Sequence, residues 1–175
     1  MKLVYADPPY FGQCKSYEHF HNDGGAMPWD GHCWDEEQTH LDLLAWLTEN
    51  ADGWAYSCNP SDAARVGSFG RVGSWCKTFH QIRPKLATQH ALELVIFKES
   101  RPLMYRKPMV RDWLTSSIAM KKGQRGAKPD VFNDWILALI GYEVGDEFTD
   151  LFPGSHSMQR AIDRKIEAGE TDPSV

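Results

Sequence analysis

A chain of 175 residues, 42% of them hydrophobic, is long enough to bury the core of one globular domain. The net charge of −5 argues against a uniformly basic nucleic-acid binder, and no apolar run is long enough to span a membrane. The first residues lack the basic, apolar and small-residue order of a secretory signal, so we expect a cytoplasmic protein. The four cysteines form no CxxC pair, which favours reduced structural thiols.

The chain alternates strand-like and helix-like segments. Apolar runs and helical spacing predict, in chain order, a strand at 3–6, a long loop at 11–34, a helix at 36–50, a strand at 53–58, a short helix capped by Ser61 at 61–66, strands at 75–82 and 92–97, a helix at 129–140, a strand at 147–152 and a helix at 158–167. Pro129 is expected to open its helix and Gly141 to end it. This order indicates a three-layer α/β domain at 1–166 with a largely parallel sheet, followed by a polar tail at 167–175.

Two of the predicted strands end in segments that carry candidate functional side chains. The first strand leads into Asp7-Pro-Pro-Tyr10, where two prolines fix the backbone and supply no N–H donors. The last strand leads into Asp150-Leu-Phe-Pro-Gly-Ser155, directly before a helix. Ligands bind outside the carboxyl ends of strands in open parallel sheets, so neighbouring strands would make these loops two halves of one site. By itself, Asp7–Tyr10 also fits an ordinary strand-to-loop turn.

Three motifs together resemble the amino-group DNA methyltransferases, chiefly those that make N6-methyladenine. Asp7-Pro-Pro-Tyr10 is similar to their catalytic DPPY motif. Asp150-Leu-Phe-Pro-Gly-Ser-His156 is similar to the DxFxGxG loop that binds S-adenosylmethionine (SAM), and Gly126-Ala-Lys-Pro129 resembles the QKP element that precedes this loop in permuted members. The resemblance implies a three-layer, Rossmann-like methyltransferase fold with one antiparallel strand and a circularly permuted motif order. It covers both ends of the chain and little of 11–100.

The resemblance implies transfer of a methyl group from SAM directly to the N6 amino group of adenine in DNA. Asp7 and the carbonyl of Pro8 would each accept an N6 hydrogen, and the rigid Pro8-Pro9 backbone would hold these acceptors in place. Tyr10 would stack on the target base, which is flipped out of the duplex. Asp7 favours adenine over cytosine N4, and Tyr10 favours DNA over RNA, although methylation of cytosine N4 or of RNA stays open.

The cofactor-binding residues that the resemblance implies are Ala6, Asp7, Lys128, Pro129, Asp150, Phe152, Gly154, Ser155 and His156. Two features depart from the family pattern. His156 stands where a second glycine is usual, and no strand is predicted after Arg164, so the sheet would be minimal and lack its usual edge strands. A ligand for the cofactor ribose would then come from elsewhere, such as the partner in a homodimer. The alternative function is a DNA-binding module that keeps the fold with little or no activity.

The segment 98–128 is strongly basic, with nine Lys and Arg residues against Glu99 and Asp112. Charge alone fits a solvated loop as well as a phosphate-binding one. With the resemblance, we expect this segment to contact DNA. The candidate DNA-binding residues are Arg101, Arg106, Lys107, Arg111, Lys121, Lys122 and Arg125. By analogy, the small size and compact motif set suggest a phage or other mobile-element origin.

Cysteine and histidine residues gather in the first loop and just after it. They are Cys14, His19, His21, His32, Cys33 and His40. They show no tight zinc-finger spacing, so we expect no metal and interpret the loop as facing the substrate. Trp29 and Trp34 belong to the same interpretation, or they anchor the loop to the core.

Overall fold

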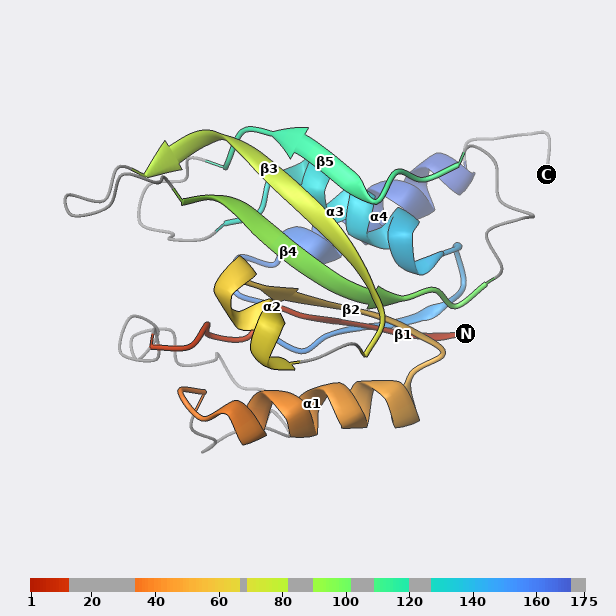
Figure 1. Ribbon diagram of the computed structural model, residues 1–175. Helices are drawn as coiled ribbons and strands as arrows, with labels where there is room; N and C mark the ends of the chain where they lie inside the picture. The colour runs from red at the N-terminus through yellow and green to blue at the C-terminus, as the bar shows by residue number, and fades with distance from the viewer. Residues whose placement is uncertain (13–33, 67–68, 82–89, 102–108, 120–126, 171–175) are drawn as a thin grey trace.

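The computed structural model describes residues 1–12, 34–66, 69–81, 90–101, 109–119 and 127–170 (Figure 1). The elements are, in chain order, β1 Lys2–Ala6, α1 Glu37–Asn50, β2 Gly53–Cys58, α2 Pro60–Val66, β3 Arg71–Gln81, β4 His90–Lys98, β5 Trp113–Ser116, α3 Asp130–Ile140, β6 Glu147–Asp150 and α4 Ser157–Glu170. Alternating strands and helices make up most of the described chain, as the sequence predicts.

The six strands form one mixed sheet in the order β5-β3-β4-β2-β1-β6. β1 lies between β2 and β6 and is parallel to both, and β3 is parallel to β5. β4 runs antiparallel to its neighbours β2 and β3, so among the strands of the described residues it alone is reversed. This confirms the prediction of a largely parallel sheet with a single antiparallel strand.

Helices cover both faces of the sheet and create two separate cores. α1 and α2 lie on one face and α3 and α4 on the other (Figure 1). In β1, Leu3 and Tyr5 belong to the core under α3 and α4, whereas Val4 and Ala6 belong to the core under α1. Burial on both faces explains why this strand is a continuous apolar run rather than an alternating one. The three-layer prediction is confirmed.

The ends of α3 follow from its flanking residues. Pro129 precedes the helix in an extended conformation, and its carbonyl accepts the N–H groups of Phe132 and Asn133. Gly141 ends the helix with a φ of 82°, a left-handed conformation that glycine adopts without strain. Its N–H and that of Tyr142 donate to the carbonyl of Leu137, which would otherwise lack a helical partner. The predicted start is therefore displaced by one residue and the predicted stop is confirmed.

The structure corrects several of the predicted elements. Ser61 does not cap α2, because the helix begins at Pro60 and the carbonyl of Asn59 receives the first N–H groups. β5 was not predicted at all, and it lies inside the basic segment. α4 continues to Glu170, so part of the predicted polar tail is helical.

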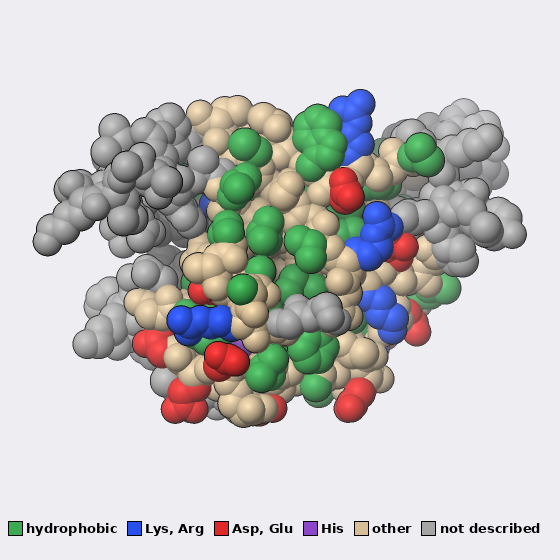
Figure 2. Space-filling view, viewed as in Figure 1, with side chains coloured by type: hydrophobic (Ala, Val, Ile, Leu, Met, Phe, Trp, Pro, Cys, Tyr) green, Lys and Arg blue, Asp and Glu red, His purple; other side chains and the backbone are tan. Residues whose placement is uncertain are grey.

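The sheet ends at β6 on one side and at β5 on the other. Within the described residues only α4 follows β6, which agrees with the prediction of a minimal sheet. On the face that α1 and α2 cover elsewhere, hydrophobic side chains remain visible over β3, β4 and β5 (Figure 2). Val72, Leu92 and Trp113 are the large exposed apolar residues of these strands. No helix in the described ranges is long and apolar enough to cross a membrane.

Candidate active site

The two predicted half-sites emerge from neighbouring strands. β1 and β6 are parallel, with Tyr5 paired to Asp150, and the N–H of Leu151 donates to the carbonyl of Tyr5 at 2.9 Å. Both strands therefore end at the same edge of the sheet, and Asp7 follows Tyr5 by only two residues. The structure brings Asp7–Tyr10 and the Asp150 loop together, as the strand-end argument expects.

The carboxylate of Asp7 is held by two side chains. The hydroxyl of Tyr10 donates to Oδ1 at 3.2 Å, and the ammonium of Lys128 lies 3.1 Å from Oδ2. Pro8 is buried and Pro9 is half-buried, so the backbone between Asp7 and Tyr10 is both packed and fixed in φ. Burial raises the pKa of Asp7 above its usual range, and the positive charge of Lys128 partly opposes this rise.

Lys128 connects Asp7 to an acidic residue that the sequence analysis did not single out. Its ammonium lies 2.6 Å from Oε1 of Glu93, and the other oxygen of Glu93 lies 3.0 Å from the ammonium of Lys77. Burial acts to raise the pKa of Glu93, but the two lysines outweigh it, and the pKa is lowered. The signal in the sequence was a single charged residue inside the apolar run Leu92–Phe97.

The Asp150 loop combines a partly buried acid with two left-handed residues. The N–H of Phe152 donates to Oδ1 of Asp150 at 3.1 Å, while burial and the nearby Asp7 raise the pKa of Asp150 to about 7. Gly154 has a φ of 43° and His156 a φ of 54°. His156 therefore keeps the left-handed backbone that favours glycine, and its side chain is exposed.

Two hydrogen bonds hold the second half of the Asp150 loop, and one of them joins the loop to α4. The guanidinium of Arg160 donates to the carbonyl of Ser155 at 2.8 Å, and the N–H of His156 donates to the carbonyl of Pro153 at 2.6 Å. A Cβ added at Gly154 would meet only the carbonyl of Phe152, at 3.7 Å. The loop therefore leaves space beside Gly154, where a ligand could approach the backbone.

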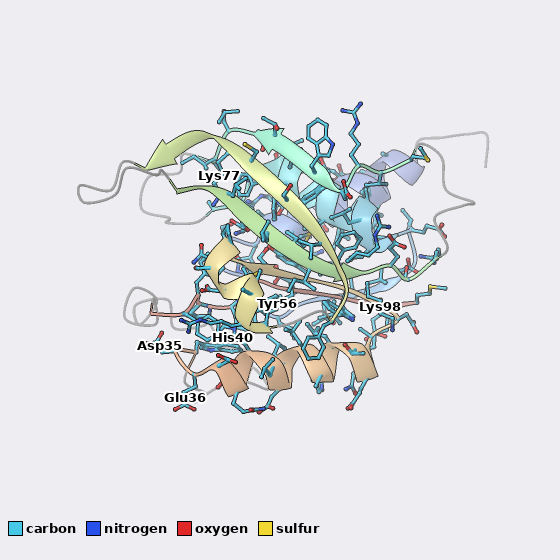
Figure 3. The ribbon with its side chains drawn as sticks, in the orientation of Figure 1. Asp35, Glu36, His40, Tyr56, Lys77 and Lys98 are labelled. Atoms are coloured by element: carbon cyan, nitrogen blue, oxygen red, sulfur yellow. The ribbon has the colours of Figure 1, made fainter. Side chains whose placement is uncertain are left out.

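A cluster of rings lies next to the site on the α1 face. Phe11 contacts His40 at a centroid distance of 4.2 Å, and Trp34 contacts Phe152 at 5.1 Å. The carbonyl of Trp34 accepts a hydrogen bond from Nε2 of His40, so Nδ1 of the neutral ring accepts the hydroxyl proton of Tyr56 (Figure 3). Burial lowers the pKa of His40, which keeps the ring neutral. Within the described residues, no three His, Cys, Asp or Glu side chains are grouped as metal ligands would be.

The candidate DNA-binding residues are only partly described. Arg106, Lys107, Lys121, Lys122 and Arg125 lie outside the described residues, as do the candidate loop residues Cys14, His19, His21, Trp29, His32 and Cys33. Arg111 is exposed and its guanidinium lies over the ring of Trp113, 5.1 Å from the centroid. Arg101 forms a bidentate ion pair with Asp146, which immediately precedes β6. It therefore lies near the start of this strand, at the edge of the sheet opposite Asp7.

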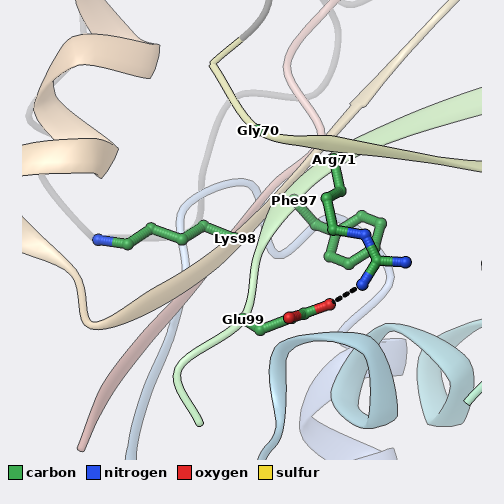
Figure 4. Close-up of a pocket in the computed structure, with 5 residues that line it drawn as sticks. All are labelled: Gly70, Arg71, Phe97, Lys98 and Glu99. Carbon is green, nitrogen blue, oxygen red and sulfur yellow. Dashed lines mark hydrogen bonds and ion pairs between the residues drawn. The ribbon is translucent and has the colours of Figure 1, made fainter. Parts of the chain in front are cut away.

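An open hollow of about 320 Å³ lies away from the candidate site. It is lined by Gly70, Arg71, Phe97, Lys98 and Glu99, and Arg71 pairs with Glu99 across the ring of Phe97 (Figure 4). Lys98 is paired with Trp54 near the start of β2, whereas Lys77 lies in the second half of β3 (Figure 3). The hollow is thus at the opposite end of the sheet from Asp7 and takes no part in the candidate site.

Comparisons with known proteins agree with this architecture. Neither a scan against protein-family models nor a search of curated proteins found a match. Among solved structures, the chain is similar to the crystal structure of the M1.HpyAVI–SAM complex, with 16% sequence identity and a TM-score of 0.59. The match covers 94% of this chain and 78% of that one. The layers, the sheet and this structural match together establish that the chain has a Rossmann-like methyltransferase fold.

Proposed function

We propose that the protein transfers a methyl group from SAM to the N6 amino group of adenine in DNA. One observation carries this proposal: the DPPY motif and the Asp150 loop leave neighbouring parallel strands at one edge of a methyltransferase-like sheet. The solved neighbour is a complex with SAM, which supports the same cofactor here. The order of the motifs along the chain supports assignment to the permuted DPPY type.

The residues around this edge fit SAM. Three segments meet there: the end of β1 with Ala6 and Asp7, the Lys128-Pro129 entry to α3, and the loop from Asp150 to His156. In the loop, the open space beside Gly154 would admit the cofactor close to the backbone. The partly buried carboxyl of Asp150 would accept a hydrogen bond from a polar group of the cofactor, and Phe152, Ser155 and His156 would line its surroundings. When bound, SAM supplies an electrophilic methyl group on a sulfonium ion.

The side chains of the DPPY motif would prepare the base. An exocyclic amine is a poor nucleophile because its lone pair is delocalised into the ring. Asp7 has lone pairs beyond those that Tyr10 and Lys128 engage, so it would still accept one N6 hydrogen, and the Pro8 carbonyl would accept the other. Both acceptors sit on a rigid backbone, which keeps their geometry fixed as the nitrogen becomes tetrahedral. The Tyr10 ring would stack on the flipped base.

DNA is the proposed partner, with the basic segment 98–128 as the phosphate-contacting surface. Arg111 is the described member that supports this assignment, because it is exposed beside the half-exposed ring of Trp113. Arg101 stays in the prediction with the other cations, although its ion pair with Asp146 competes with phosphate. A homodimer that completes the cofactor site stays a proposal as well.

The decisive experiment measures methyl transfer with isotopically labelled SAM. Purified protein is incubated with DNA, the DNA is digested to nucleosides, and mass spectrometry separates labelled N6-methyladenine from N4-methylcytosine; a parallel reaction uses RNA. We expect labelled N6-methyladenine from DNA with the wild-type protein and none with Asp7→Ala, because the amine then loses an acceptor. Calorimetry is expected to give nearly the same SAM affinity for both proteins.

Asp42→Ala is the matched control, since Asp42 is an exposed acid on α1 whose carboxylate accepts a hydrogen bond from Gln38 on the same helix. It should keep wild-type activity. Full activity in Asp7→Ala would refute the proposed chemistry. A folded wild-type protein that binds no SAM would instead indicate a DNA-binding module with this fold, and labelled RNA or N4-methylcytosine would move the chemistry to another substrate.

A further inference from the structure

Four charged side chains form a line of alternating sign that ends on Asp7. They are Lys77 on β3, Glu93 on β4, Lys128 before α3 and Asp7 after β1, and the successive ion-pair distances are 3.0, 2.6 and 3.1 Å. Four separate segments of the chain therefore contribute one charge each. We propose that Glu93 and Lys128 are positioning residues that fix the Asp7 carboxylate for its reaction; this inference rests on the proposed function.

The two central charges of this line, those of Glu93 and Lys128, are buried. The side chains of Glu93 and Lys128 are only 3% and 9% exposed. Removing two charges from water costs several kcal/mol per ion, and well-packed apolar residues in their place are often equally or more stable. Stability alone therefore gives no reason to keep an ion pair here. A role in holding the adjacent Asp7 does give one.

The position of Glu93 is determined by the pairing of β4 in the sheet. This residue is paired with Trp75 on β3, and the next residue, Leu94, is paired with both β2 and β3, so this part of β4 is held in the sheet. Lys128 reaches Glu93 from the segment before α3. The ammonium of Lys128 lies 5.3 Å from the ring centroid of Phe132 and 6.0 Å from that of Trp75, and these rings limit where it can move.

The hydrogen-bonding capacity of Lys128 is used within this group. An ammonium has three hydrogens, and Glu93, Asp7 and the hydroxyl of Tyr10 lie at 2.6, 3.1 and 3.5 Å. The lysine therefore contacts the catalytic motif directly, in addition to the place beside the cofactor that the resemblance implies. The positive charge of Lys128 opposes the protonation of Asp7. Because Lys128 also pairs with Glu93, it offsets the negative charge of Asp7 only in part.

Lys77 completes the charge balance. Its ammonium pairs with the second oxygen of Glu93 and lies 4.9 Å from the ring centroid of Trp75. With Lys77 present, the four groups sum to no net charge. The double variant Lys77→Met/Glu93→Gln removes one positive and one negative charge, so the net charge of the group stays at zero. It therefore tests how Glu93 holds Lys128 without leaving a surplus buried charge.

The first measurement follows the ionisation of Asp7 by carbon-13 NMR of labelled carboxyl groups, with Asp7→Asn to assign the signal. It requires no turnover, so it is independent of the proposed function. We expect the pKa of Asp7 to rise by about one unit or more in Lys128→Met, because an opposite charge at this distance lowers a carboxyl pKa by about 1 to 3 units. Lys128→Arg should keep most of the wild-type value. An unchanged titration in Lys128→Met would overturn the inference, whatever the enzyme does.

The second measurement separates turnover from binding. In Glu93→Gln and in the double variant, we expect kcat to fall by about tenfold or more, since a misplacement of about 1 Å costs up to about a hundredfold. The dissociation constant for SAM should stay within about twofold, because these residues hold Asp7 rather than the cofactor. Asp42→Asn is the control, since Asp42 is an exposed acid on α1, outside both the candidate site and the basic segment. Wild-type kcat in the folded double variant would overturn the role of Glu93.

Discussion

Replacing Asp150 by asparagine is expected to stabilise the free protein at alkaline pH. Asp150 lies at the end of β6, where burial is the main cause that raises its pKa to about 7. Asparagine has nearly the same shape and still accepts the N–H of Phe152, but it never ionises. The substitution thus removes a partly buried charge and little else.

The magnitude follows from linkage between proton binding and folding. The folded protein binds a proton at Asp150 below about pH 7, whereas the unfolded chain releases it near its ordinary value of about 4. Between these values the folded state holds more protons, so stability falls as the pH rises. From about pH 5 to about pH 8 the loss is roughly 2 to 3 kcal/mol, at about 1.4 kcal/mol per unit. Asp150→Asn lacks this loss.

Urea unfolding of both proteins at about pH 5 and about pH 8 measures the effect. His40 and other groups that do not interact with Asp150 contribute equally to both proteins and cancel in the comparison. We expect similar midpoints at the lower pH and a midpoint higher by about 1 M urea for Asp150→Asn at the upper pH. The same pH dependence in both proteins would refute the reasoning, because Asp150 would then titrate as an exposed acid.

Four further substitutions test the fold. Phe132→Ala removes a ring at the centre of the larger core, so the free energy of unfolding should fall by about 3 to 5 kcal/mol, whereas Val131→Ala on the exposed side should change it little. Gly141→Ala places a Cβ at a φ of 82° and should cost about 1 to 2 kcal/mol in thermal or urea unfolding. Tyr56→Phe leaves Nδ1 of buried His40 without its donor and should cost about 1 to 3 kcal/mol. Because the pKa of His40 is lowered in the folded state, its neutral ring contributes stability that is lost as the pH falls below about 6.5. The free energy of unfolding of His40→Gln should not show this loss at acid pH.

Elements with a strong local pattern could be predicted from the sequence. β2 was predicted with the observed bounds, and the Pro129 and Gly141 signals placed α3 to within one residue. β5 could not be predicted, because it has four residues of alternating exposure and is held by distant partners. It pairs with β3, and Ser116 accepts a hydrogen bond from the indole of Trp75. Periodicity in a short window does not contain such contacts.

The residues of the candidate site also fall into those that could be predicted from the sequence and those that could not. Asp7 and Asp150 could be located because each follows an apolar strand, and parallel strands bring such ends together. Glu93 and Lys77 were not singled out, because a charged residue in a strand is usually solvated. Their role depends on Lys128, which lies 35 residues after Glu93. No spacing rule links these positions, and only the assembled sheet brings them into contact.

The position of β1 in the sheet has a consequence for how the protein is made. β1 leaves the ribosome before the other strands, yet its partner β6 pairs with it across 145 residues, from Leu3 to Phe148. Until β6 is synthesised, one edge of an apolar strand keeps unpaired N–H and carbonyl groups, which invite pairing with other chains. Closing so long a loop costs about 4 kcal/mol of chain entropy. β1 is therefore made long before its pairing is complete, and Asp7 gains its neighbour Asp150 only when β6 pairs.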